Sequence, residues 1–220
     1  MPAAVVVGAG PGIGTSVAER FAREGFSVAV IARRRSTVER SAATVGHSGR
    51  TVLPLTADST DEAALRDALS TAASELGPIE TAVYNAALIR PDAPGELGVR
   101  GQLDAWAVNV VGALTMAAHV APDMAARGHG SILVTGGMPR PDPAYVSLGL
   151  GKAGVRALVG LLDAHYGPAG VHVASVTVPG AVAPGTACDP DDIAEHYWRL
   201  HSQPREAWEH EVVHGGVPVP

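Results

Sequence analysis

The residues with the most specific chemistry form a glycine-rich turn near the start of the chain, Gly8-Ala9-Gly10-Pro11-Gly12-Ile13-Gly14. A short apolar run from Ala3 to Gly8 predicts a buried strand before the turn, and an amphipathic stretch from about Gly12 to Glu24 predicts a helix after it. Glycines let backbone N–H groups approach a phosphate, and a helix N-terminus favours an anion. This strand–turn–helix context favours a pyrophosphate site over an ordinary tight turn. The residues expected at the phosphates are Gly8, Gly12, Ile13 and Gly14.

Three consecutive arginines, Arg33 to Arg35, follow a second apolar strand expected over Ser27 to Ala32. In a dinucleotide fold this point faces the adenosine ribose, where an acidic residue binds the 2′-hydroxyl and an arginine accommodates a 2′-phosphate. Ala32 stands at the end of the strand, where no acid is present. The sequence therefore predicts NADP(H) in preference to NAD(H), with Arg33 and Arg34 as contacts. A solvated basic start of a helix is the alternative.

Apolar strands and amphipathic helices alternate along the rest of the chain. Alternation of this kind predicts an α/β fold with a parallel sheet covered on both faces. We find no internal repeat or linker and expect one domain over residues 1–220, with residues 215–220 as a frayed tail. The further strands are expected over 51–55, 79–84, 131–135, 171–178 and 208–213. The further helices are expected over 36–45, from a capping box at 59–62 to 76, over 102–127, over 146–166, and from the N-cap Asp189 to about 203.

Composition excludes several classes of protein. The 220 residues are 46% hydrophobic and 17% charged, which is typical of a globular domain. The formal charge of −6 argues against a nucleic-acid partner. A single cysteine, Cys188, fits a reducing cytoplasm. We find no apolar run close to the roughly 20 residues of a membrane span and expect no membrane association.

Further motifs extend the pattern along nearly the whole chain, with the order and spacing of a known family. These are Gly8, Gly12, Gly14, Arg33, Asp58, Asn85, Asn109, Lys152 and Pro179-Gly180. Taken together, the sequence resembles a short-chain dehydrogenase/reductase. The resemblance implies a doubly wound Rossmann-type domain with a mostly parallel seven-stranded sheet in the order 3-2-1-4-5-6-7.

The resemblance also implies roles for single residues. Asp58 would meet the adenine. Asn85 would be the second residue of the loop that in the family reads Asn-Asn-Ala-Gly, with Tyr84 in place of the first asparagine and Ala87 in place of the glycine. Asn109 matches the asparagine that holds a water in the proton relay. Lys152 matches the lysine that binds the nicotinamide ribose and lowers the pKa of the catalytic tyrosine. The turn that places the nicotinamide would comprise Pro179, Gly180 and Val182.

Two positions depart from the family pattern. Leu148 stands four residues before Lys152, where the family has its proton-transferring tyrosine, and a leucine cannot transfer a proton. Gly137 occupies the expected position of the catalytic serine. Nearby hydroxyl groups that could substitute are those of Thr135, Tyr145 and Ser147.

None of these hydroxyls has the family's spacing. Tyr145 is on roughly the same helical face as Leu148 if the helix begins that early, but it lies seven residues before Lys152; packing in the loop is the alternative. Ser147 would need a shifted helix start, and Thr135 could belong to the strand. A water organised by Asn109 and Lys152 is a further route. Loss of one general acid costs about 10²–10⁴ in rate, so the reaction would be slowed and not abolished.

Metal binding and assembly can also be addressed from the sequence. The nine histidines include no helical pair with an accompanying acid, so we expect no metal site. Glycines recur in the helix of Lys152, which suggests that another backbone packs closely there. The resemblance implies a homodimer or homotetramer formed through the helices of Asn109 and Lys152.

Three functions follow from these observations. The first is an atypical NADP(H)-dependent oxidoreductase acting on a small carbonyl, imine or conjugated substrate. The second is a lyase, isomerase or cyclase that reuses the pocket without redox chemistry. The third is a catalytically inactive sensor that binds NADP(H).

Overall fold

The sheet of the protein has seven strands in the order β3-β2-β1-β4-β5-β6-β7. A computed structural model describes residues 2–216. All six strand pairs are parallel, including β6 with β7 at the edge. The expected fold class and strand order are thereby confirmed. The strands are β1 (Ala3–Val7), β2 (Ser27–Ala32), β3 (Val52–Thr56), β4 (Ile79–Tyr84), β5 (Gly130–Gly137), β6 (Val171–Val178) and β7 (Glu211–Val213).

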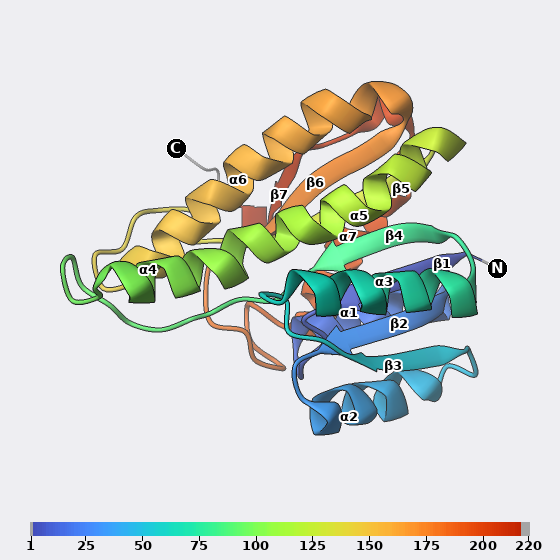
Figure 1. The fold of residues 1–220 in the computed structure, drawn as a ribbon, viewed down its shortest axis with the longest axis horizontal. Coiled ribbons are helices and arrows are strands. Elements are labelled where there is room, and N and C mark those ends of the chain that lie inside the picture. The colour runs from blue at the N-terminus through green and yellow to red at the C-terminus, as the bar shows by residue number, and fades with distance from the viewer. Residues whose placement is uncertain (1, 217–220) are drawn as a thin grey trace.

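Helices cover both faces of the sheet (Figure 1). One face packs against α3, α5 and α6, and the other against α1, α2 and α7, which gives two separate apolar cores. The strands are buried on both faces, and this explains why they appear in the sequence as continuous apolar runs. The helices are α1 (Ile13–Arg23), α2 (Arg35–Gly46), α3 (Glu62–Leu76), α4 (Val99–Trp106), α5 (Gly112–Arg127), α6 (Val146–Tyr166) and α7 (Pro190–His201).

The long helix expected over 102–127 contains a π-helical turn, η1 (Ala107–Val111), between α4 and α5. In this turn the N–H of Gly112 donates to the carbonyl of Ala107, five residues back. The hydroxyl of Tyr84 donates to the carbonyl of Val108 over 2.6 Å. A Cβ on Gly112 would lie 2.2 Å from the Tyr84 hydroxyl. Gly112 therefore makes room for a hydrogen bond that fixes η1 against β4.

The continuous helix Val99–Arg127 is long enough, and contains an 18-residue window apolar enough, to meet the criterion for a membrane span. Our expectation that no segment meets this criterion is wrong. Half of the apolar window is buried, however, and α5 packs on α3, β4 and β5. The apolar character of this helix therefore serves the core.

Several expected boundaries need correction. The N-cap of α3 is Asp61, whose carboxylate accepts the N–H of Ala64 over 3.0 Å, and not Ser59. Asp58 holds the backbone N–H of Thr60, so the helix begins after that turn. β5 continues to Gly137, and β7 is limited to three residues. Asp189 caps α7 as expected. In the expected tail, residues 215 and 216 lie in a short 3₁₀ turn and 217–220 lie outside the described residues.

Candidate functional site

The glycine-rich turn joins β1 to α1 through close contacts between backbone atoms. Gly8 has a φ of +89°, and a Cβ there would lie 2.3 Å from the N of Ala86. A Cβ on Gly14 would lie 2.4 Å from the carbonyl of Gly8. Asn85 donates from Nδ2 to that same carbonyl over 2.9 Å. Only glycine fits at positions 8 and 14, and the turn is thereby held against the end of β4.

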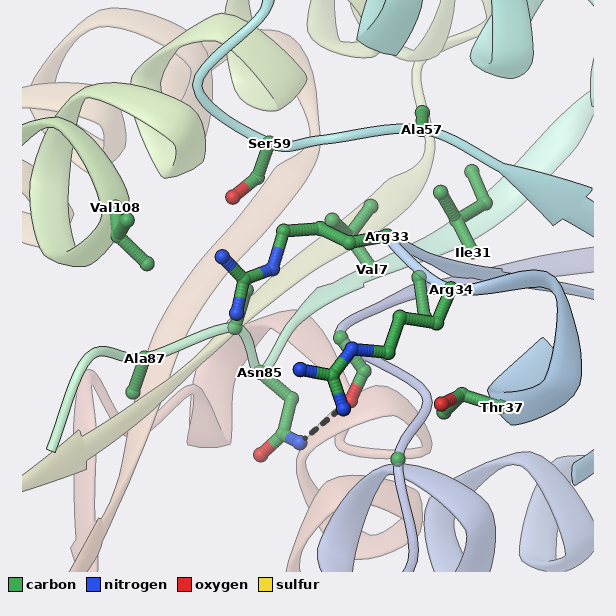
Figure 2. A pocket seen from close by; sticks show the side chains of 14 residues that line it. Val7, Ile31, Arg33, Arg34, Thr37, Ala57, Ser59, Asn85, Ala87 and Val108 are labelled. Carbon is green, nitrogen blue, oxygen red and sulfur yellow. Dashed lines mark hydrogen bonds between the residues drawn. The ribbon is translucent and has the colours of Figure 1, made fainter.

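Beside this turn is a cavity of about 350 Å³ at the carboxyl ends of β1, β2 and β4. Figure 2 shows the side chains of Arg33 and Arg34 reaching into it, among Ser59, Asn85 and Val108. Among the residues that line the cavity none is acidic. An open sheet places its ligand in this kind of crevice.

The three arginines after β2 differ in their partners. Arg35 pairs with Glu39 one helical turn later over 2.7 Å. In the part of the chain that the structure describes, Arg33 and Arg34 form neither an ion pair nor a side-chain hydrogen bond, and both are exposed. Two guanidinium groups at the cavity are therefore available to an anionic ligand.

Asp58 does not present its carboxylate to the cavity. Its Oδ1 accepts from both the N–H and the hydroxyl of Thr60, over 2.9 and 2.8 Å. The neighbouring residues Ala57 and Ser59 line the cavity instead. Oδ1 of Asp58 is thus engaged in the turn that precedes α3.

The loop after β6 closes on the glycine-rich turn. A Cβ on Gly12 would lie 3.8 Å from Cγ1 of Val182, and one on Gly180 would lie 3.4 Å from Sγ of Cys188. Cys188 is a buried free thiol. The structure thus brings Val182 beside Gly12 of the glycine-rich turn, although 170 positions along the chain separate them.

Lys152 is buried on α6 and faces the end of β5. Its Nζ donates to the carbonyl of Thr135 over 2.7 Å. Burial lowers the pKa of Lys152 to about 8, and the nearby guanidinium of Arg156 adds to this effect. Arg156 itself pairs with Glu211 over 3.1 Å and donates to the carbonyl of Gly137 over 2.9 Å. The lysine is therefore buried, bonded to a backbone carbonyl and close to an arginine that is itself paired with a carboxylate.

The hydroxyl of Thr135 is engaged on the opposite face of the sheet. It donates to Oδ1 of Asn85 over 2.8 Å and lies 2.6 Å from the hydroxyl of Tyr197. Tyr197 is fully buried in the core with α1 and α7, and burial raises its pKa. Only the backbone carbonyl of Thr135 reaches Lys152, which argues against Thr135 as a proton donor.

The hydroxyl of Ser147 is bound to a buried carboxylate. It donates to Oδ1 of Asp92 over 2.8 Å, and the N–H of Ser147 lies 3.1 and 3.0 Å from the two carboxylate oxygens. Tyr145 is the N-cap residue of α6 but provides no side-chain cap, so Asp92 performs that function from another loop. Asp92 was not predicted from the sequence. The one available signal is that α6 begins without a capping side chain of its own, so that a group from elsewhere in the chain must supply the cap.

Gly137 and Leu148 are the two positions that depart from the family pattern. Gly137 lies beside Lys152, and Leu148 lies on the same helix, α6. A Cβ on Gly137 would lie 3.5 Å from Cε of Lys152, so this position faces the lysine directly. Leu148 lies in the first turn of α6 and is buried. Tyr145 precedes the first helical residue, roughly 10 Å along the helix axis from Lys152.

Asn109 lies in η1 and is buried against α6. Its Oδ1 accepts the N–H of Leu88 over 2.8 Å, and its Nδ2 donates to the Leu88 carbonyl over 3.4 Å. A Cβ on Gly151 would lie 2.7 Å from the Cβ of Asn109. The structure therefore brings Asn109, the loop after β4 and the lysine helix together.

Within residues 2–216 the structure contains no group of three or more His, Cys, Asp or Glu side chains that could hold a metal ion. The ring nitrogens of His196 and His214 approach to 3.1 Å, a contact that their spacing in the sequence did not suggest.

Fold and cavity together define an α/β protein of the nucleotide-binding Rossmann type. The profile of the short chain dehydrogenase family matches residues 2–191. The chain therefore belongs to the short-chain dehydrogenase family and is an oxidoreductase of that type.

Individual relatives agree with this assignment. The short-chain reductase protein NovJ of Streptomyces niveus is 29% identical over 195 residues, covering 87% of this chain and 72% of the relative. The cis-4-hydroxycyclohexanecarboxylate dehydrogenase of Sinomonas cyclohexanicum is 30% identical over 194 residues, covering 85% and 74%.

Solved structures show the same fold. A short-chain dehydrogenase from Rhodopseudomonas palustris is 25% identical with a TM-score of 0.87, covering 96% of this chain and 97% of that one. An alcohol dehydrogenase from Thermococcus sibiricus, solved with 5-hydroxy-NADP, is 24% identical with a TM-score of 0.87 and covers 97% and 95%.

Proposed function

We propose that this chain is an NADP(H)-dependent oxidoreductase of a small carbonyl, imine or conjugated substrate, and that it handles the proton without the family's tyrosine. One observation supports the cofactor preference most strongly. Arg33 and Arg34 border the cavity without partners in the described chain, while Arg35 beside them is paired with Glu39. A 2′-phosphate carries the charge that two such guanidinium groups recognise.

The residues present fit a dinucleotide. Gly8 and Gly14 allow backbone approaches that a Cβ would block, and the turn opens directly onto the N-terminus of α1. Arg33 and Arg34 would hold the adenosine phosphate, and Val182 would lie along the phosphates. When bound, the cofactor would supply a hydride to the substrate or accept one from it.

In this proposal Asn109 and Lys152 organise the reacting end of the site. Asn109 fixes the loop after β4 through Leu88, and Lys152 presents an ammonium group beside Gly137. Leu148 and Gly137 stand where the family has its proton-handling hydroxyls. Tyr145 stays a candidate donor, although its helical position separates it from Lys152 by about two turns.

Binding of the reduced cofactors tests the proposal directly. NADPH fluorescence should change on binding at micromolar protein, and NADH should bind about 10–100-fold more weakly, because a charge-assisted contact to the 2′-phosphate contributes about 1.5–3 kcal/mol. Arg33→Ala should weaken NADPH by a similar factor and leave NADH within about threefold. Arg35→Ala is the matched control and should leave both affinities unchanged. No binding of either cofactor would refute the proposal.

A catalytically inactive NADP(H)-binding protein is the second candidate. It is favoured by the engagement of the Thr135 and Ser147 hydroxyls in structural hydrogen bonds. This candidate predicts tight NADPH binding with no turnover across a broad carbonyl panel.

We further propose that residues 1–220 form one cytoplasmic domain that assembles as a homodimer or homotetramer through the helices of Asn109 and Lys152. Large apolar side chains are exposed along these helices: Val99, Leu103, Trp106, Val111, Leu114, Leu150 and Leu161. Exposed apolar side chains grouped on one surface are typical of an interface. A light-scattering mass equal to the 22.4 kDa monomer would contradict the assembly.

A further inference from the structure

We propose that His196 and His214 form a pH-dependent tether that holds the loop between β6 and α7 beside the glycine-rich turn and releases this loop in acid. The loop comprises residues 179–189 and includes Val182, which lies beside Gly12. The inference goes beyond the proposed function, because it concerns the opening of a loop and not the reaction.

One hydrogen bond joins the middle of this loop to a distant part of the chain. Nε2 of His214 lies 2.8 Å from the carbonyl oxygen of Ala187. Among residues 2–216, no other hydrogen bond joins residues 181–188 to a group outside the loop. Their remaining bonds, such as that from the N–H of Ala183 to the carbonyl of Cys188, stay within the loop. The contact with His214 therefore anchors a segment that is otherwise bonded to itself.

Most of the loop is also exposed. Residues 181, 182 and 184–187 are exposed, and Cys188 is buried. Val182 and Pro184 help to line a cavity of about 470 Å³, together with Gly12 of the glycine-rich turn and Arg40 of α2. A loop with few buried side chains opens at low cost once its polar anchor is lost. Such an opening would widen this cavity beside the glycine-rich turn.

The contacts of the two rings fix where their protons lie. A carbonyl oxygen only accepts, so Nε2 of His214 must carry a proton to bond Ala187. Nδ1 of a neutral His214 then has a lone pair, and it lies 3.1 Å from Nε2 of His196. Nε2 of His196 therefore carries the proton between the rings, which meet edge to face with centroids 5.3 Å apart. The closed contact thus requires a neutral His214.

The charged groups around the pair come from three segments. Asp192 and Arg199 lie on α7 with His196, and Glu209 precedes β7. In the loop, the carboxylate of Asp189 accepts the N–H groups of Gly185 and Asp191. The titratable side chain of β6 is at the opposite end of that strand. Burial lowers the pKa of His196, His214 and Arg199 lower it further, and Glu209 and Asp192 oppose this.

Acid favours the open loop because the open state binds more protons. A proton on Nδ1 of His214 would place two N–H groups against each other in the closed contact with His196. Rings released into water take up protons near the ordinary histidine pKa of about 6.5. The closed state is therefore fully favoured above that pH, and its stability falls as the pH falls below it.

The thiol of Cys188 reports opening of the loop in the cofactor-free protein. It is the one cysteine of the chain and is buried, so a thiol reagent reaches it when the loop opens. The measured quantity is its rate of reaction with dithiodipyridine, divided by the rate in urea-unfolded protein at the same pH. We expect this quotient to rise about tenfold from about pH 7.5 to about pH 5.5, since opening is coupled to uptake of one proton.

His196→Gln is the variant that separates the tether from its pH dependence. A glutamine amide can present either its N–H or its oxygen to Nδ1 of His214, so both protonation states of His214 keep the contact. The quotient should then stay within about twofold between the two pH values. His214→Ala removes the tether, and its quotient should be high at both. His165→Gln, at an exposed histidine near the end of α6, is the control and should behave as wild type.

Two results would overturn the proposal. One is a wild-type quotient that is equal at both pH values. The other is a His196→Gln variant that keeps the full rise, because the proton would then be taken up elsewhere. The thiol measurement needs no cofactor, so absence of NADPH binding would refute the proposed function and leave the test of the tether intact.

Discussion

Two regions at the carboxyl edge of the sheet are built differently. At β1 and β2, backbone glycines approach one another closely, and two arginines extend into the cavity without partners in the described chain. At β5 and α6, Thr135 and Ser147 have structural partners, and Leu148 and Gly137 carry no hydroxyl. The first region has cationic side chains at a cavity that are unpaired within the described residues, and the second has a buried lysine, Lys152, whose ammonium group donates to a backbone carbonyl.

This difference shows how binding and proton transfer can be separated within one fold. Recognition of phosphates depends on backbone conformation and on charge, which survive changes in nearby side chains. Proton transfer depends on a single titratable group at the correct position. A substitution at one residue can therefore change the chemistry and leave the nucleotide region intact.

The largest expected effect is at the nucleotide end, in Gly8→Ala. The positive φ and the 2.3 Å approach to the Ala86 N leave no space for a Cβ. We expect a loss of about 3 kcal/mol or more in the free energy of unfolding and at least a hundredfold weaker NADPH binding. Urea unfolding and fluorescence titration measure the two effects. Gly46→Ala, with no atom within 4 Å of its added Cβ, is the control and should be close to neutral.

A smaller effect on stability is expected for Gly151→Ala, on α6 in the region of Lys152. The added Cβ would meet Asn109 at 2.7 Å and push η1 from α6. We expect a loss of about 1–3 kcal/mol in stability, with NADPH affinity within about threefold.

Gly160→Ala on the same helix meets no atom within 4 Å and should stabilise the protein by about 0.5–1 kcal/mol. If Gly151→Ala behaved like Gly160→Ala, the close packing of α6 on η1 would not be essential. If Gly151→Ala abolished NADPH binding, the packing of α6 on η1 would affect the nucleotide region as well.

Much of the fold could be predicted because its signals are local. Apolar runs and helical periodicity located the seven strands and the major helices, and the family resemblance supplied the strand order confirmed by the structure. The expected start of α3 was wrong because neighbouring polar side chains compete for the same backbone N–H groups. Asp61 caps α3 in place of Ser59, because Asp58 first closes a turn with Thr60.

The details of the candidate site were less accessible, because they depend on contacts between distant segments. Asp92 lies 55 positions before Ser147, and Tyr197 lies 62 after Thr135. Periodicity and motif spacing carry no information on such pairs. The sequence could identify Thr135 and Ser147 as hydroxyls near the site, but it could not show that both were already engaged.

The central claim is that the chain keeps a competent nucleotide region and Lys152, and that it departs from the family at the proton-handling positions 137 and 148. Leu148→Tyr tests it most directly, with Leu148→Phe as the control for the added ring. Ketone reduction and NADPH affinity should be measured on both variants. We expect the tyrosine variant to reduce a simple ketone at least tenfold faster than the phenylalanine variant, with NADPH affinities within about threefold. Equal rates in two folded, NADPH-binding variants would contradict the account.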